Sequence, residues 1–149
     1  MAVSYKPADT QNVIPYLVIS DPQKELDFLK QVFGAKETHI SRDPGGRIMH
    51  AQVKIGDSVV MMGQAGEQWP SLSAAIYVYL PDVDAAYKRA LAAGATSMMQ
   101  PADQFYGDRS GGVKSSNGVQ WWMATHIEDV SEQEIERRAV EAFKKRAHT

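Results

Sequence analysis

The apolar positions between residues 13 and 62 predict a strand, a helix and three further strands, in that order. The run Val13–Ser20 is apolar almost throughout, and Asp21-Pro22 follows it as a helix N-cap and first helical residue. Gly34 is the expected end of this helix. Pro15 lacks a backbone N–H, so it favours an edge position for the first strand. The apolar stripe of the predicted helix consists of Leu26, Leu29, Val32 and Phe33.

Alternation of side chains predicts the three strands that complete this first set. They are expected over residues 37–41, 47–55 and 58–62, with turns at 43–46 and at Gly56-Asp57. Residues 63–71 contain two glycines and a proline without apolar periodicity, which is typical of a linker.

The same order of elements then repeats at an offset of 61 positions. A strand over 74–80 precedes Asp82, which begins a second helix, and Gly94 ends that helix as Gly34 ends the first. Further strands are expected over 96–100, 112–115 and 119–125. The buried side of the second helix is expected to consist of Val83, Tyr87, Ala90 and Leu91.

The repeat predicts an α+β fold in which two βαβββ modules, related by a pseudo-twofold axis, form a cupped mixed sheet. A single domain spans residues 1–149, with module 1 at about 12–64, a linker at 65–72 and module 2 at about 73–127. A C-terminal helix is expected at about 131–147, because Ser131-Glu132-Gln133-Glu134 is a capping box. Acidic residues early and basic residues late in this helix suit its dipole.

A polar segment from Gln104 to Gly111 interrupts the second module. Its glycines and serines predict a loop, which leaves tyrosine, aspartate and arginine side chains at one strand end. Asn117-Gly118 is typical of a two-residue hairpin turn in which both residues have positive φ. The loop can also be read as a solvated segment with an ordinary surface ion pair.

Composition narrows the functional classes. The chain is 44% apolar and 23% charged, with a formal net charge of −2, so neither a nucleic-acid-binding polycation nor an acidic disordered chain is indicated. The absence of cysteine excludes disulfides and thiolate chemistry. Residues 1–12 lack a signal-peptide pattern, and no apolar run approaches the roughly 20 residues of a spanning helix. We expect a soluble cytoplasmic protein without nucleic-acid or membrane partners.

Two βαβββ modules joined by a linker resemble the vicinal oxygen chelate superfamily of glyoxalases, bleomycin-resistance proteins and dioxygenases. A finer resemblance is to its PhnB-like, or 3-demethylubiquinone-methyltransferase-like, branch. The segments that carry it, within about residues 12–140, are Pro15-Tyr16-Leu17-Val18, Phe33-Gly34-Ala35, Met49-His50-Ala51, Ile55-Gly56-Asp57-Ser58, Asp82-Val83-Asp84, Ala93-Gly94-Ala95, residues 103–111 and residues 124–130.

The resemblance implies a cup that, in much of the superfamily, holds a divalent metal on His, Glu or Gln side chains. These ligands lie on the first and last strands of each module. The matching positions in this sequence are Ile14, Ala75, Trp122 and the region 60–62, and none of these side chains suits such a cation. We therefore expect no metal in that position, and no other cofactor.

The cup is expected to be lined by aromatic side chains with few polar groups. If the first-strand ligand position points inward, strand alternation puts Tyr16, Tyr77, Tyr79 and Trp122 on its inner side, with Trp121 and Met123 facing the helices. Four residues are expected to reach in from the loop: Gln104, Tyr106, Asp108 and Arg109. The planar guanidinium of Arg109 is suited to binding a carboxylate. Asp108 is expected either to orient Arg109 or to neutralise it. Core packing without a cavity is the competing interpretation.

The histidines at 39, 50, 126 and 148 offer one candidate for catalysis. His50 lies on a cup-forming strand and titrates near neutrality, so it is the predicted catalytic residue, and a hydrogen bond to neighbouring backbone is the structural alternative. Two of the four could also form a metal site outside the superfamily position.

Two functions remain open from the sequence. Both bind a small organic molecule in the cup. In the first, the protein is a metal-independent lyase or isomerase that uses His50 as base and the Asp108-Arg109 pair to hold an anionic substrate. In the second, it is a non-catalytic sequestration protein of the bleomycin-resistance type. A homodimer is expected, because superfamily relatives pair their modules and sheet edges need covering.

Overall fold

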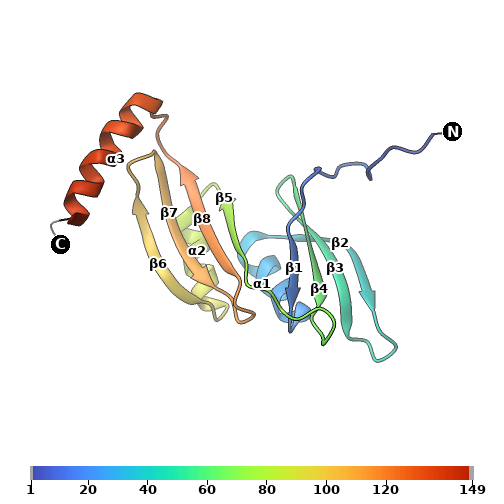
Figure 1. Cartoon of the computed structure of the whole chain (residues 1–149). Helices are drawn as coiled ribbons and strands as arrows, with labels where there is room; N and C mark the ends of the chain where they lie inside the picture. Colours follow the sequence, from blue (N-terminus) through green and yellow to red (C-terminus); the bar gives the residue numbers. More distant parts are fainter. Residues whose placement is uncertain (1, 148–149) are drawn as a thin grey trace. The chain divides into compact units, whose positions relative to one another are not determined.

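The computed structural model describes residues 2–147 (Figure 1). The chain divides into two compact units. The first unit contains the residues up to Ala74 together with Ser115–Val119, and the second contains the rest of the described chain. Each unit is built around one four-stranded mixed sheet.

The first unit has the strand order β1-β4-β3-β2, with β1 parallel to β4 and the other neighbours antiparallel. Its elements are β1 (Tyr16–Ile19), α1 (Pro22–Phe33), β2 (Lys36–Arg42), β3 (Ile48–Ile55) and β4 (Ser58–Gln64). The strand that follows Pro15 is an edge strand, as predicted. Helix α1 packs on β3 and β4 and covers one face of the sheet. The core between helix and sheet includes Leu17, Leu29, Val53 and Met62, all at most 2% exposed.

Helix α1 begins and ends where local chemistry predicts. The Asp21 carboxylate accepts a hydrogen bond from the Lys24 N–H, and Gly34 adopts φ 65° at the C-terminal end. A buried carboxylate lies in this helix, because Glu25 is 0% exposed. Ser115 Oγ donates to it at 2.7 Å and Asn117 Nδ2 at 3.1 Å. The segment 115–119 therefore satisfies a charge that would otherwise be costly to bury.

The second unit has the equivalent order β5-β8-β7-β6, with β5 parallel to β8. Its elements are β5 (Ala75–Tyr79), α2 (Val83–Ala92), β6 (Thr96–Asp103), β7 (Asp108–Lys114), β8 (Gln120–His126) and α3 (Glu132–Ala147). Helix α2 packs on β6, β7 and β8, and Trp121 and Met123 are fully buried on that side. We call the opposite side of this sheet, away from α2, the open face. The predicted α+β fold of two βαβββ modules and a C-terminal helix is confirmed.

Two details of the second unit differ from the prediction. Leu91 is 39% exposed, and Ala86 takes the buried position on α2 instead. The predicted loop extends only over residues 104–107, because β7 already begins at Asp108. Strand β7 lies between β6 and β8, and the hydrogen bonds from both neighbours outweigh the low strand propensity of its glycines and serine.

The hairpin between β7 and β8 has a three-residue loop, so the predicted two-residue turn is wrong. Ser115 N donates to Val119 O at 2.9 Å and Gly118 N to Ser115 O at 2.9 Å. Gly118 has φ 82°, and among the described residues of this turn it alone has positive φ. This is the three-residue loop that ends on a left-handed glycine. It sets the register that pairs Lys114 with Gln120 and Asp108 with His126.

Helix α3 follows the predicted capping residue, and Ser131 Oγ accepts a hydrogen bond from Glu134 N. Arg138 ties it to the second unit by donating to Phe105 O and to the Glu128 carboxylate. Phe143, on the C-terminal half of α3, is 64% exposed. Within residues 2–147, no helix combines the length and the apolar character needed to span a bilayer.

Candidate functional site

A buried carboxylate at the start of β7 is the centre of the candidate site. Asp108 is only 3% exposed, although it lies at the end of its strand. It pairs directly with His126 across the β7–β8 ladder, so the two side chains project from the same face of the sheet. The predicted site residue Asp108 therefore lies on the open face.

Two phenols from β5 hold this carboxylate. Tyr77 and Tyr79 alternate with buried-side residues on β5 and both project from the open face. Each hydroxyl donates to Asp108 Oδ2 at 2.8 Å. The two rings meet edge to face with their centroids 5.3 Å apart. The structure thus brings together three of the predicted ligand-binding residues.

The imidazole of His126 also binds Asp108, and the sequence did not single this residue out. We call Asp108, Tyr77, Tyr79 and His126 the cluster. His126 Nδ1 lies 2.9 Å from Asp108 Oδ1, and His126 Nε2 lies 2.8 Å from Asp129 Oδ1. An ionised carboxylate can only accept hydrogen bonds, so both ring nitrogens must donate. The arrangement therefore fits the protonated imidazolium form of His126.

The electrostatics agree with this assignment. Hydrogen bonds from His126 to Asp108 and then to Asp129 raise the pKa of the imidazole above its ordinary value. Burial raises the pKa of Asp108, but the donors His126, Tyr77 and Tyr79 outweigh it, and the net pKa is lowered. Burial and the bond to Asp108 raise the pKa of Tyr77, and the bond to Asp108 followed by burial raises that of Tyr79. Just below pH 6.5, the ordinary pKa of histidine, the cluster is thus an ionised carboxylate with a charged imidazole and two neutral phenols.

We expect the stabilisation contributed by His126 to be fully present below pH 6.5 and to be lost as the pH rises through its raised pKa. The protonated form is favoured in the folded state, so deprotonation costs the folded state more. Melting temperatures of the wild type and His126→Gln, compared between about pH 5.5 and 9, should converge as the pH rises. Asp108 stays ionised over this range because its pKa is lowered. A gap that stayed constant or widened would contradict the assignment.

Trp122 supplies an aromatic surface further along the open face. It pairs with Tyr77 on one side and with Gly112 on the other. A Cβ atom at Gly112 would lie 2.5 Å from the Trp122 ring, so the indole lies directly over this glycine. Trp122 Nε1 donates to Gln120 Oε1 at 3.2 Å. Trp122 therefore lies on the open face, and Trp121 faces α2, as alternation predicts.

Arg109 lies away from the carboxylate cluster. Its guanidinium forms a bidentate pair with Asp84 of α2, at 2.8 and 2.9 Å, and contacts Asp103 at 3.0 Å. Neighbouring residues of a strand project to opposite faces, so Asp108 points to the open face and Arg109 to the helix face. The predicted Asp108-Arg109 pair is therefore not formed, and the structure gives Arg109 two other carboxylate partners.

The remaining predicted loop residues lie close to β6 and β5. Gln104 Nε2 donates to Ala102 O at 3.4 Å. Tyr106 meets Phe105 edge to face, and its phenol is near enough to Tyr77 to help raise the pKa of that residue. Tyr106 thus lies beside the phenol of Tyr77, whereas Gln104 interacts with its own strand end.

His50, the predicted catalytic residue, belongs to the first unit. Its ring lies 5.7 Å from that of Tyr16 and 6.1 Å from that of His39. Burial, followed by the neighbouring His39, lowers its pKa. His50 is therefore a neutral imidazole at pH 7, a form that can accept a proton, and its catalytic role stays a prediction. His148 lies outside the described residues.

The residues at the superfamily metal positions do not fit a metal. Ala75 and Trp122 occupy the open face of the second sheet, and Met61 occupies the equivalent position between β1 and β3. Within residues 2–147, no group of three or more His, Asp or Glu side chains has the arrangement of a metal site.

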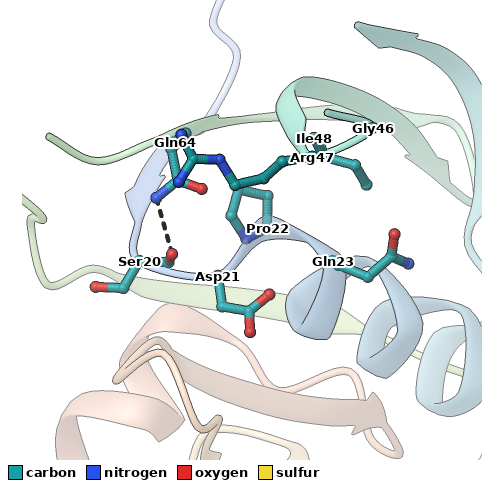
Figure 2. Close-up of a pocket in the computed structure, with 8 residues that line it drawn as sticks. All are labelled: Ser20, Asp21, Pro22, Gln23, Gly46, Arg47, Ile48 and Gln64. Carbon is teal, nitrogen blue, oxygen red and sulfur yellow. Dashed lines mark hydrogen bonds between the residues drawn. The ribbon is translucent and has the colours of Figure 1, made fainter. Parts of the chain in front are cut away.

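A groove of about 340 Å³ lies at the start of α1. Figure 2 shows that the Asp21 side chain points away from Arg47 and Gln64. The polar groups of the groove already have partners, since Gln64 Nε2 donates to Ser20 O and Asp21 caps the helix. The residues around it are Ser20, Asp21, Pro22, Gln23, Gly46, Arg47, Ile48 and Gln64. None of these is a predicted site residue.

The hairpin register could have revealed His126. Counting outward from a three-residue loop at 116–118 pairs Asp108 with His126, whereas a two-residue Asn117-Gly118 turn pairs Asp108 with Ile127. With the two-residue turn, the register shifts by one residue and His126 lies on the opposite face from Asp108. The sequence therefore indicates the Asp108–His126 pair only if the turn type is known.

Comparison with known proteins places this geometry in a family context. The family model "Glyoxalase/Bleomycin resistance protein/Dioxygenase superfamily" matches residues 11–123. An uncharacterized protein of Mycobacterium bovis is 31% identical over 147 residues, covering 91% of this chain and 94% of that protein. An uncharacterized protein of Mycobacterium tuberculosis strain H37Rv is also 31% identical, covering 91% of this chain and 84% of its own length.

Solved structures show the same fold. TioX from Micromonospora sp. ML1 is similar with a TM-score of 0.68 and 27% identity, covering 78% of this chain and 99% of that one. TnmS3, an antibiotic binding protein from Streptomyces sp. CB03234, has a TM-score of 0.62 and 19% identity, covering 81% and 99%.

Proposed function

Because the chain belongs to the glyoxalase/bleomycin resistance protein/dioxygenase superfamily, we propose that it binds a small planar organic molecule on the open face of its second sheet. The observation that carries this proposal is the anchoring of Tyr77 and Tyr79. Their hydroxyls are held by a buried carboxylate, yet the two residues remain 45% and 62% exposed. Fixed aromatic rings lose little conformational entropy on binding, which favours their use as a recognition surface.

We also propose that the chain belongs to the PhnB-like branch of the superfamily. Two of the segments that carry that resemblance, residues 103–111 and 124–130, contribute Asp108, His126 and Asp129 to one cluster. A sequence motif whose polar residues converge in this way is better explained by a shared site than by an ordinary surface loop.

Non-catalytic sequestration is the version of this proposal that we favour. The superfamily metal positions carry side chains that do not suit a metal, and the fold is shared with an antibiotic binding protein. Metal-independent lyase or isomerase chemistry is the second candidate. It is supported by the neutral imidazole of His50 and by the Asp108–His126 pair, each able to take part in proton transfer. The expected homodimer stays a prediction.

Replacement of Trp122 by alanine should weaken binding of a planar aromatic probe about tenfold, because a buried aromatic contact contributes about 1–3 kcal/mol. The probe is 2-naphthalenemethanol, which is neutral and flat, and its dissociation constant can be measured by NMR titration. Lys145→Ala, on the exposed end of α3, is the control and should leave the affinity unchanged.

Two outcomes of this titration would contradict the proposal. If the wild type fails to bind the probe and a wider set of planar aromatic compounds in a thermal-shift screen, the open face is not a binding surface. Unchanged affinity in a folded Trp122→Ala variant would move the site away from β8.

A further inference from the structure

His126 lies at one end of the open face, and its imidazole already binds the exposed carboxylate of Asp129. His126 Nε2 donates to Asp129, whose side chain is fully exposed, while His126 Nδ1 donates to the buried Asp108. The two carboxylates bonded to His126 differ in burial and in the number of donors that they accept from. Asp108 is fixed by three donors, whereas Asp129 is fully exposed in the segment between β8 and α3.

We propose that the ligand of this face is an aromatic carboxylic acid, and that Asp129 occupies the place of its carboxylate at His126 Nε2 when the protein is free. This inference rests on the proposed function and adds the chemical class of the ligand. An exposed ion pair contributes little, because water and salt compete with it, so a ligand carboxylate can displace Asp129 at small cost. The buried pair with Asp108 keeps the imidazole oriented during that exchange.

Within this cluster the positive charge lies on His126, between the carboxylates of Asp108 and Asp129. Groups that face the imidazole are the carboxylates of Asp108 and Asp129 and the phenols of Tyr77 and Tyr79, with Tyr106 beside Tyr77. The neighbouring guanidiniums have other partners. Arg109 is held by Asp84 and Asp103 on the helix face, and Arg138 is held by Glu128 and Glu134. The imidazolium is therefore the cation of this cluster.

The spacing along β8 suits a flat acid. Trp122 and His126 are four residues apart on one face of the strand, a separation of about 13 Å. The rings of Tyr77 and Tyr79 reach across the small residues Ser110 and Ala124, which are at most 3% exposed, to contact Asp108. A fused aromatic ring can therefore lie on the phenols with its carboxylate directed at His126.

The test compares 2-naphthoate with its neutral analogue 2-naphthalenemethanol, using NMR titration at pH 6. In the wild type, naphthoate should bind about fivefold more tightly than the alcohol. Asp129→Asn should tighten naphthoate about threefold and leave the alcohol unchanged, because the competing carboxylate is removed. Glu136→Gln, which removes a carboxylate from the exposed side of α3, is the matched control and should change neither affinity.

His126→Gln should make the two affinities equal, and its folding can be checked from the amide spectrum. In the wild type the preference for naphthoate should also fall as the pH rises through the raised pKa of His126. Equal binding of the two probes by the wild type, or an unchanged naphthoate affinity in Asp129→Asn, overturns this inference and leaves the proposed function standing. Failure of both probes to bind overturns the proposed function and this inference with it.

Discussion

Replacing Asp108 with alanine should lower the free energy of unfolding by about 3 kcal/mol, because three donors lose one shared ionised acceptor. Each hydrogen bond to a charged group contributes about 1.5–3 kcal/mol, and partial rehydration of the exposed phenols reduces the sum. The lost donors are the hydroxyls of Tyr77 and Tyr79 and Nδ1 of His126. Urea unfolding followed by tryptophan fluorescence measures the change, since Trp121 and Trp122 both lie in β8.

One further variant separates the charge of the Asp108 carboxylate from its shape, and a second serves as a control. Asp108→Asn keeps an acceptor oxygen and the side-chain size, so it should lose about half as much stability as the alanine variant. Asp27→Ala removes an exposed carboxylate from α1 and should stay within about 0.5 kcal/mol of the wild type. An Asp108→Ala variant as stable as Asp27→Ala would mean that the cluster does not hold the phenols in place.

The sequence predicted the helices and the repeat because their signals are local. Asp21 and Asp82 each cap a helix through their own side chains, accepting hydrogen bonds from Lys24 N and Ala85 N. The glycine after α1 adopts the left-handed conformation that ends a helix. Such features depend on residues three or four positions apart and need no knowledge of the rest of the chain.

Strand β7 shows where local signals fail. Residues 108–112 include two glycines and a serine, and by propensity they belong to a loop. Backbone pairing with β6 and β8 makes them a central strand. A Cβ at Gly111 would lie 3.0 Å from Met99 O, and one at Gly112 would meet the Trp122 ring. The small residues are thus needed for close packing, which only the tertiary structure reveals.

The candidate site likewise contains some features that local sequence signals predict and others that depend on tertiary structure. Alternation on β5 and β8 was sufficient to put Tyr77, Tyr79 and Trp122 on one face, because a strand has a fixed period of two. The hydrogen bonds to Asp108 and the part played by His126 depend on the β7–β8 register, which the loop length sets. The pairing of Arg109 with Asp84 depends on the packing of α2 against the sheet, so it had no sequence signal.

Replacing Gly107 with alanine should destabilise the second unit by about 3–4 kcal/mol, because two separate penalties apply at this position. Gly107 has φ 100°, which disfavours any residue with a Cβ atom. An added Cβ would also lie 2.2 Å from the backbone oxygen of Glu128, which cannot rotate away. Gly107 O accepts hydrogen bonds from Ile127 N and Glu128 N, so relieving the clash disturbs the segment that follows β8.

Gly46→Ala is the matched control for the backbone penalty alone. Gly46 has φ 89°, and no atom lies within 4 Å of the position that its Cβ would occupy. The alanine there should cost about 1 kcal/mol, from the strained conformation without a clash. Urea unfolding of the two variants should therefore differ by at least about 2 kcal/mol. If Gly107→Ala were no worse than Gly46→Ala, residues 127–128 would not pack on the β6–β7 turn.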